Sequence, residues 1–459
     1  MQDLTTGSLS RHLLKTTGYM LVTMVFQTLY FLIDLYWVGR LGTAQVAAVG
    51  IAGNLTFIVL ALSQMLGVGT TAVVSHAVGQ KDRARAQLMF NQSQVLSLLT
   101  GLVFFVVAML LRDPYVNAMS ADADTARYAR EYLNWFIPAM ALQFALVAMG
   151  AALRGTGNFR PGTLVSTGSV IINMVLAPFL IFGWGTGRAY GVAGAAISSL
   201  IAIVVGLVWI ALYFYGPKAY LHLAPRTWAP RLNAWKKMLA IGLPTGFEFA
   251  MMAVYMVIVY SVSRPFGAAA QAGFGIGQRI IQAGFMPVVA LGFAVAPVAG
   301  QNFGARLPHR VKATFKDGAL MATGVMLVLT ILCHLIPGPL IGAFSEDLAV
   351  TAVGAEYLEI ISWNFVASGL IFVASSMFQA MGNTVPSLIA SAVRITLVAI
   401  PALWMSRMPG FQLYWIWYVA VGAVLVHLTV SLLFLRREFR LRLGGMEPAR
   451  DVVLAAETV

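Results

Sequence analysis

Two acidic residues lie inside long apolar segments of the chain, Asp34 and Glu248. A carboxylate in hydrocarbon costs about 2.5 kcal/mol or more, so an acid at such a position is expected to face a cavity and to have a role. Burial in a low-dielectric environment favours the protonated form of a carboxyl group. An acid that gains and loses a proton near neutral pH can couple proton movement to another process. The chemistry that these two residues predict is therefore reversible proton binding.

The surroundings of Asp34 in the sequence fit this chemistry. On a helix, Gln27, Tyr30, Phe31 and Asp34 share one face. Tyr30 and Gln27 can hydrogen-bond the acid, while aromatic and apolar neighbours remove it from water. We therefore expect Asp34 to couple ions, with Tyr30 and Gln27 beside it. The alternative is an ion pair with Arg40 at the outer interface, although Arg40 lies off that face.

Glu248 follows Pro244 by one helical turn, close to mid-depth of its apolar segment. It either lines a substrate cavity or pairs with Arg279 or another buried base. The apolar segments hold two bases, Arg279 and Arg394, which match the two acids in number. Mutual neutralisation is the plain expectation for these four groups, and contact of the bases with anionic substrates is the alternative.

Aromatic and methionine side chains cluster in the sequence around Glu248. Soft, polarisable side chains and aromatic faces suit flat cationic compounds through adaptable packing and cation–π contact. We expect the substrate cavity to include Glu248, Met252, Tyr255, Phe274 and Arg279.

The composition shows what kind of protein must position these groups. The chain has 459 residues, 59% of them apolar and only 10% charged, whereas about 25% is typical of soluble domains. Reading for apolar runs of about 20 residues, the length of a membrane-spanning helix, predicts twelve spans. The spans lie near residues 16–38, 45–73, 88–111, 128–152, 162–183, 190–215, 239–263, 270–298, 318–338, 357–381, 386–405 and 412–435. The predicted fold class is an all-α polytopic membrane protein.

The distribution of charge predicts the orientation of the chain. On the side of the N-terminus the loops and the tail carry 21 bases, and the opposite loops carry seven. The positive-inside rule then places both termini in the cytoplasm, and we expect the protein in a bacterial inner membrane. The net charge of +13 thus reflects topology and lipid contact, and it gives no reason to expect a nucleic-acid partner.

The sequence gives no sign of a metal site, an organic cofactor or an enzyme. A single cysteine, Cys333, excludes a disulfide framework, and the six histidines show no metal-binding spacing. Neither a catalytic triad pattern nor a phosphate-binding loop appears. The energy for any transport should therefore come from an ion gradient.

Glycine, asparagine and proline positions repeat at a constant offset of 225 residues. The repeated positions are Gly42, Gly50, Gly67, Gly79, Gly157, Asn158 and Pro161, matched by Gly267, Gly275, Gly292, Gly304, Gly382, Asn383 and Pro386. Each repeat holds six spans, so the two halves should have the same orientation and a pseudo-twofold relation. We predict an N-lobe at 1–215, a cytoplasmic linker at 216–237, a C-lobe at 238–435 and a basic tail at 436–459. This is the layout of an alternating-access transporter, which we expect to be a monomer.

Several short motifs resemble the multidrug and toxic compound extrusion (MATE) family. They are the segment from Asp34 to Gly42, the loop Gly79-Gln80-Lys81-Asp82 with its repeat from Gly300 to Ala305, and the pair Leu153–Asn158 and Gln379–Thr384. The resemblance implies a V-shaped pair of six-helix lobes and export of amphiphilic, often cationic, compounds in exchange for protons or sodium ions. A major-facilitator transporter also has six plus six spans, but its D-R-x-G-R-R motif is missing from the first cytoplasmic loop.

Asn173 resembles the asparagine of the family's N-x-x-x-D motif, in which both polar residues line the N-lobe cavity. Here Ala177 stands in place of the second acid. Because hard cations prefer several oxygen ligands, one carboxylate and one amide favour proton coupling over sodium coupling. An interhelical hydrogen bond is the alternative role of Asn173. Sodium-coupled antiport, a polyprenyl-lipid or polysaccharide flippase and, more remotely, a membrane-bound lipid transferase remain the alternative functions.

Overall fold

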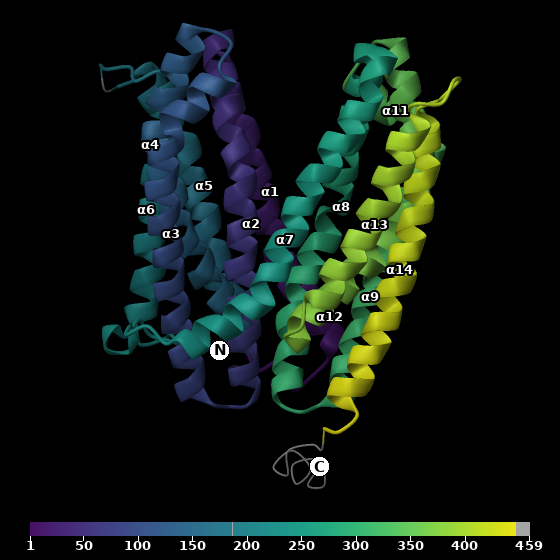
Figure 1. The fold of residues 1–459 in the computed structure, drawn as a ribbon. Helices are drawn as coiled ribbons and strands as arrows, with labels where there is room; N and C mark the ends of the chain where they lie inside the picture. The colour runs from purple at the N-terminus through teal and green to yellow at the C-terminus, as the bar shows by residue number, and fades with distance from the viewer. Residues whose placement is uncertain (186, 447–459) are drawn as a thin grey trace. The chain divides into compact units, whose positions relative to one another are not determined.

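The structure is a computed structural model that describes residues 1–185 and 187–446. The chain divides into two compact units (Figure 1). Unit 1 contains Met1–Asp3 and Gly18–Gly246, and unit 2 contains Leu4–Thr17 and the chain from Phe247 onward. The regular secondary structure of the described residues is entirely helical.

Unit 1 is a helical bundle with α4 at its centre, packed against α2, α3, α5 and α6. Its helices are α2 (Thr43–Gly79), α3 (Arg83–Met119), α4 (Ala123–Gly155), α5 (Phe159–Phe182), α6 (Val192–Tyr215), the larger part of α1 (Leu9–Gly39), the first half of α7 (Leu232–Ser263) and the 3₁₀ turn Pro225–Thr227. Large apolar side chains such as Phe90, Phe144 and Phe214 fill the core.

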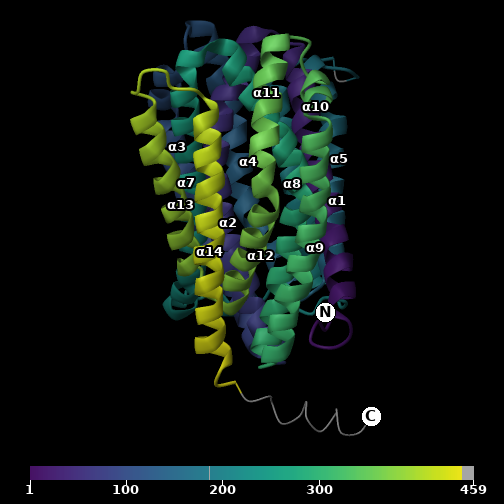
Figure 2. The ribbon, with the colours of Figure 1, turned by 90° about the vertical axis from the view of Figure 1, so that its right-hand side faces the viewer.

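Unit 2 is a second bundle, in which α8 packs against α9, α11 and α12, and α14 packs against α12 and α13. Figure 2 shows α11 and α12 following one another end to end. The helices are α8 (Gly267–Gly304), α9 (Pro308–Leu335), α10 (Pro337–Gly342), α11 (Leu348–Ile361), α12 (Phe365–Met381), α13 (Val385–Met405) and α14 (Tyr414–Leu443), with 3₁₀ turns at Arg264–Phe266 and Ser362–Asn364.

The predicted membrane spans are confirmed. Within the described part of the chain, 11 helical segments are long and apolar enough to cross a membrane. The longest, Leu232–Gly304, has 73 residues and contains both α7 and α8. Every one of the twelve predicted spans therefore has a helical counterpart.

The sequence repeat has a counterpart in local geometry. Lys81 and Arg306, 225 positions apart, follow α2 and α8, and both have φ of 56°. The amide of the next residue then bonds back in the same way, from Asp82 to Ala77 O and from Leu307 to Asn302 O, each at 3.0 Å. The two units thus build the same turn from different residues, which indicates that backbone geometry is what the repeat preserves.

The unit boundary differs from the predicted linker at 216–237. Side chains of α3 hold this segment onto unit 1. Asn91 Oδ1 accepts from the Ala224 amide at 2.8 Å, and Gln92 Nε2 donates to Thr227 O at 2.7 Å. Helix α7 already begins at Leu232, and the contacts change units only after Gly246. The linker is therefore part of unit 1. The predicted tail at 436–459 begins inside α14, and residues 447–459 lie outside the described residues.

The N-terminal segment also departs from the predicted division, because Leu4–Thr17 belongs to unit 2. The Leu4 amide donates to Gln301 Oε1 at 3.0 Å, and Asn302 Nδ2 donates to Leu4 O at 3.1 Å. Arg310 Nη2 donates to Gly7 O at 3.0 Å. Leu4 is fully buried in the core of unit 2. Polar groups on α8 and α9 thus fix a segment that the sequence pattern assigned to the N-lobe.

Candidate functional site

Asp34 lies on α1 in unit 1, five residues before the helix ends at Gly39. Its residue is 8% exposed, and its Oδ1 atom has no hydrogen-bond partner among the described residues. Arg40, the base that could have neutralised it, hydrogen-bonds Tyr36 and lies over the Tyr36 and Trp37 rings, at 4.7 and 5.4 Å from their centroids. The described residues contain no ion pair to Asp34, so it is a buried acid without a counter-charge.

A hydrogen-bond network joins α1, α5 and α6 beside this acid. Ser199 Oγ lies 2.9 Å from the Tyr30 hydroxyl and accepts from Asn173 Nδ2 at 3.1 Å. Asn173 Nδ2 also contacts Ser198 Oγ at 3.3 Å. Ser199 donates to Ala195 O at 3.1 Å, so the hydrogen between Tyr30 and Ser199 comes from the tyrosine. The network fixes Tyr30, and the interhelical hydrogen bond considered for Asn173 is present.

Two expected contacts of Asp34 take a different form. Tyr30 bonds Ser199 rather than the acid, and Gln27 is exposed on α1. Tyr132 on α4, which the sequence reading did not select, is buried and close enough to Asp34 and Tyr30 for electrostatic interaction. Ala177, the position of the missing second acid, is fully buried. The acid thus has aromatic hydroxyl groups nearby and no second carboxylate at that position.

Glu248 lies on α7 in unit 2 and has partners that Asp34 lacks. Ser391 Oγ donates to its Oε1 at 2.6 Å, and Ser387 Oγ donates to its Oε2 at 3.1 Å. Both serines are on α13, one turn apart, and Arg394 on the same helix interacts electrostatically with Glu248. The base near Glu248 is therefore the partly buried Arg394 rather than Arg279, which is exposed on α8.

The residues expected to line a substrate cavity separate into two groups. Tyr255 lies beneath the Arg394 guanidinium, with 5.5 Å between the Cζ atom and the ring centroid, and Met252 is exposed. Phe274 is only 2% exposed, and it stacks on Trp417 with ring centroids 5.4 Å apart. The structure thus places Phe274 in the aromatic core of unit 2, because its position on α8 faces α11 and α14, and not on a cavity wall.

His427 on α14 is a further buried group near this cluster. It is 2% exposed, neither ring nitrogen has a hydrogen-bond partner among the described residues, and it interacts electrostatically with Arg394. His427 and the two serines that bond Glu248 were not predicted from the sequence. A signal was present in α13, since Ser387, Ser391 and Arg394 are spaced i, i+4, i+7 and share one helix face.

Among the described residues, no group of three or more His, Cys, Asp or Glu side chains is arranged to hold a metal ion. The arrangement in unit 1 can bind and release a proton at one carboxyl group. The arrangement in unit 2 compensates a carboxylate with two hydroxyl groups and a nearby base.

Comparison with known proteins identifies the family. Residues 20–179 and 244–405 match the family model described as MatE. The chain is 24% identical over 413 residues to the probable multidrug resistance protein YoeA of Bacillus subtilis (strain 168), covering 88% of this chain and 89% of that protein. It is 23% identical over 413 residues to the probable multidrug resistance protein NorM of Thermotoga maritima, with coverage of 89% and 88%.

A solved structure of a multidrug resistance MATE family transporter of the MOP superfamily, in an outward-facing conformation, matches the fold. The TM-score is 0.88 at 24% sequence identity, covering 96% of this chain and 98% of that chain. The family match spans more than half of the sequence and both units. This multi-pass membrane protein therefore belongs to the MATE family of transporters.

Proposed function

We propose that the protein exports amphiphilic, often cationic, compounds across the bacterial inner membrane in exchange for protons, with Asp34 as the coupling residue. The observation that carries the proposal is the isolation of this acid: it is buried, one carboxyl oxygen has no partner among the described residues, and no ion pair neutralises it. A carboxyl group in such a place binds a proton readily, since its charged form is poorly solvated.

The hydrogen bonds of the neighbouring network favour a proton over a sodium ion. Sodium needs several hard oxygen ligands. Ser198 and Ser199 both donate to Ala195 O and both accept from Asn173, so their hydrogen-bonding capacity is largely used. With Ala177 in place of a second acid, Asp34 supplies the one carboxylate at this site. A proton requires only that carboxylate.

The names of relatives support the substrate class. The similar proteins YoeA and NorM are both described as probable multidrug resistance proteins. In unit 2, the Tyr255 ring already holds the guanidinium of Arg394, and an aromatic face that accepts one cation can accept another. We infer that Glu248, Met252 and Tyr255 contribute to substrate binding, with the exposed Arg279 as a further contact.

The test is efflux of a fluorescent cation from proteoliposomes, with pH and sodium gradients imposed separately. We expect a pH gradient to drive efflux by the wild type and Asp34→Asn to reduce that efflux by about 5- to 150-fold. The matched control is Asp124→Asn, which removes an acid whose side chain is 73% exposed. Efflux driven by sodium alone, unaffected by Asp34→Asn, would contradict the proposed coupling.

A further inference from the structure

The first half of α7 has one buried face and one face that points away from the core of unit 1. The buried face consists of Ala234, Met238, Ile241 and Thr245, which recur at helical spacing. They lie where α7 crosses α2 at very short range: a Cβ on Gly69 would be 2.5 Å from Met238 O, and a Cβ on Gly242 would be 2.0 Å from Met65 O. Because glycine is required on both helices, the rotation of α7 is fixed and the opposite face must point outward.

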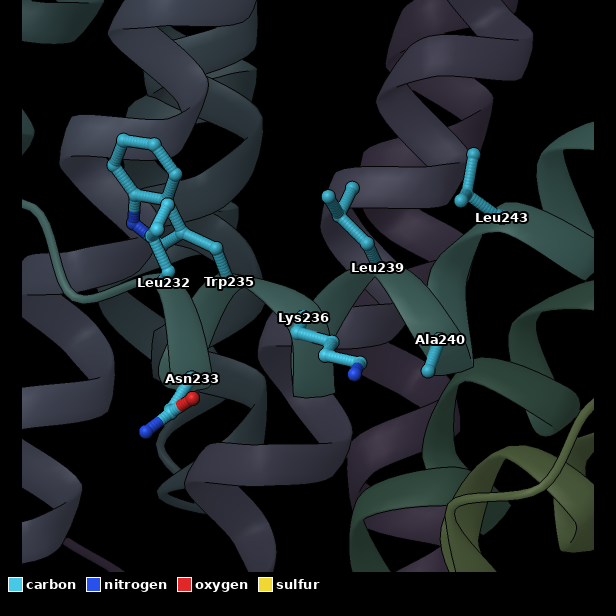
Figure 3. Close-up of a pocket in the computed structure, with 7 residues that line it drawn as sticks. All are labelled: Leu232, Asn233, Trp235, Lys236, Leu239, Ala240 and Leu243. Carbon is cyan, nitrogen blue, oxygen red and sulfur yellow. The ribbon is translucent and has the colours of Figure 1, made fainter.

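That outer face forms an open groove of about 500 Å³. Leu232 is 73% exposed and Leu243 is 42% exposed, although both are apolar. Figure 3 shows Leu239 and Leu243 on one side of the α7 ribbon and Asn233 and Lys236 on the other. The groove therefore has an apolar side and a polar, basic side, which is the pattern of a helix at a membrane interface.

Four basic residues lie on this half of α7 or in the segment just before it, and one of them, Lys236, lines the groove. Arg226, Arg231, Lys236 and Lys237 are exposed, and none of them forms an ion pair with a described residue. Lys237 is also close enough to Arg85 for the two positive charges to interact. The hydrogen bonds from α3 to the segment before α7 hold Arg231 in place, since its amide donates to Gln92 Oε1 at 2.8 Å. The backbone that carries these positive charges is therefore held against α3.

We propose that this groove binds an anionic phospholipid of the cytoplasmic leaflet, with the phosphate at Lys236 and Lys237 and an acyl chain along Leu239 and Leu243. Charge complementarity favours an anionic lipid over a neutral one, because bases without ion pairs beside a membrane-spanning helix attract anionic headgroups. The exposed leucines supply the apolar contact that a soluble anion would not use. The proposal does not depend on the coupling ion or on the transported compound.

A groove on α6 provides an internal contrast. It is lined by Val204, Val205, Val208, Trp209 and Leu212, with no charged side chain. An acyl chain can lie there, but no group selects a headgroup. We therefore expect selectivity for anionic lipid at α7 and none at α6.

The test uses the full-length protein in nanodiscs that contain equal amounts of phosphatidylglycerol and phosphatidylcholine. After extraction into mild detergent, native mass spectrometry counts the lipids that remain bound. We expect the wild type to retain phosphatidylglycerol in preference to phosphatidylcholine. Replacing both lysines, as Lys236→Gln/Lys237→Gln, should reduce that preference about 30-fold.

Two matched variants control for charge and folding. Lys236→Arg/Lys237→Arg keeps the charge and should keep the preference. Arg436→Gln/Arg437→Gln removes the same charge from exposed positions on α14 and should also keep it. An unchanged preference in the double glutamine variant at α7, or an equal loss in the α14 variant, would overturn the proposal. The same holds if glycerophosphoglycerol, which has no acyl chain, competes as strongly as the intact lipid.

Discussion

The two units contain the same pair of tyrosines beside charged groups of opposite sign. Tyr30 and Tyr132 in unit 1 lie 225 positions before Tyr255 and Tyr357 in unit 2. The first pair interacts electrostatically with Asp34, and the second pair interacts with Arg394. The repeat therefore preserved an aromatic, hydroxyl-bearing environment and changed the charge placed in it.

The acids themselves are not related by the repeat. The position of Asp34 corresponds to Val259, which is fully buried, and the position of Glu248 corresponds to Thr23. Glu248 has two serine donors and a nearby base, whereas Asp34 has an unpartnered oxygen. An acid inside an apolar helix is therefore not a coupling acid by position alone. An acid whose charge is already compensated has less reason to take up a proton.

The largest effects are expected when each acid is neutralised in turn. Asp34→Asn should reduce efflux driven by a pH gradient by about 5- to 150-fold, the usual range of coupling between two sites. Glu248→Gln should leave pH-driven efflux in place and should change mainly the apparent affinity for the transported cation. Both variants are assayed in proteoliposomes at several substrate concentrations. If only Glu248→Gln lost pH-driven efflux, Glu248 rather than Asp34 would be the coupling residue.

The hydrogen bonds of the two sites should also differ in strength. Ser391→Ala removes a 2.6 Å bond to a carboxylate and should lower the free energy of unfolding by about 1.5–3 kcal/mol. Ser199→Ala removes hydrogen bonds between neutral groups and should cost about 0.5–1.5 kcal/mol. Denaturation of the purified protein in detergent measures both. Equal costs would mean that Glu248 does not carry the charge we assign to it.

A smaller difference is expected at a repeated asparagine. Asn158 Nδ2 donates to the Tyr213 hydroxyl at 2.9 Å, and Asn383 Nδ2 donates to Glu438 Oε1 at 3.0 Å. Since bonds to charged acceptors are roughly twice as strong, Asn383→Ala should cost about 2 kcal/mol and Asn158→Ala about 1 kcal/mol. Thermal unfolding of the two variants checks this order, and a larger loss in Asn158→Ala would refute it.

The smallest effects should be equal in the two units, because here the repeat kept the backbone. Lys81 and Arg306 are exposed and share a left-handed φ of 56°. Lys81→Gly and Arg306→Gly should each raise the free energy of unfolding by about 0.5–1 kcal/mol, since glycine has no Cβ strain there. The melting temperature of each single variant and of the double variant provides the measurement. Destabilisation by either change would show that the side chain has a role of its own.

The sequence by itself predicted the helical class, the spans, the repeat and the two acids inside apolar segments. These predictions succeed because an apolar run of about 20 residues has few stable alternatives to a spanning helix. A constant offset of 225 residues between turn-forming glycines likewise reports a repeated backbone. The contact-defined units change after Gly246, beyond the linker predicted at 216–237, and no local pattern reveals that Asn91 and Gln92 bind the backbone of that segment.

Only the tertiary structure decided which side chains surround each acid. Helical periodicity shows that Tyr30 and Asp34 share a face of α1, but it cannot show that the Tyr30 hydroxyl is hydrogen-bonded to Ser199 on α6. The same holds for Glu248, whose partners come from α13, 139 and 143 positions away. Hydrogen bonds and charges act over a few ångströms in space, so the packing of the helices determines which acid is compensated and which stands alone.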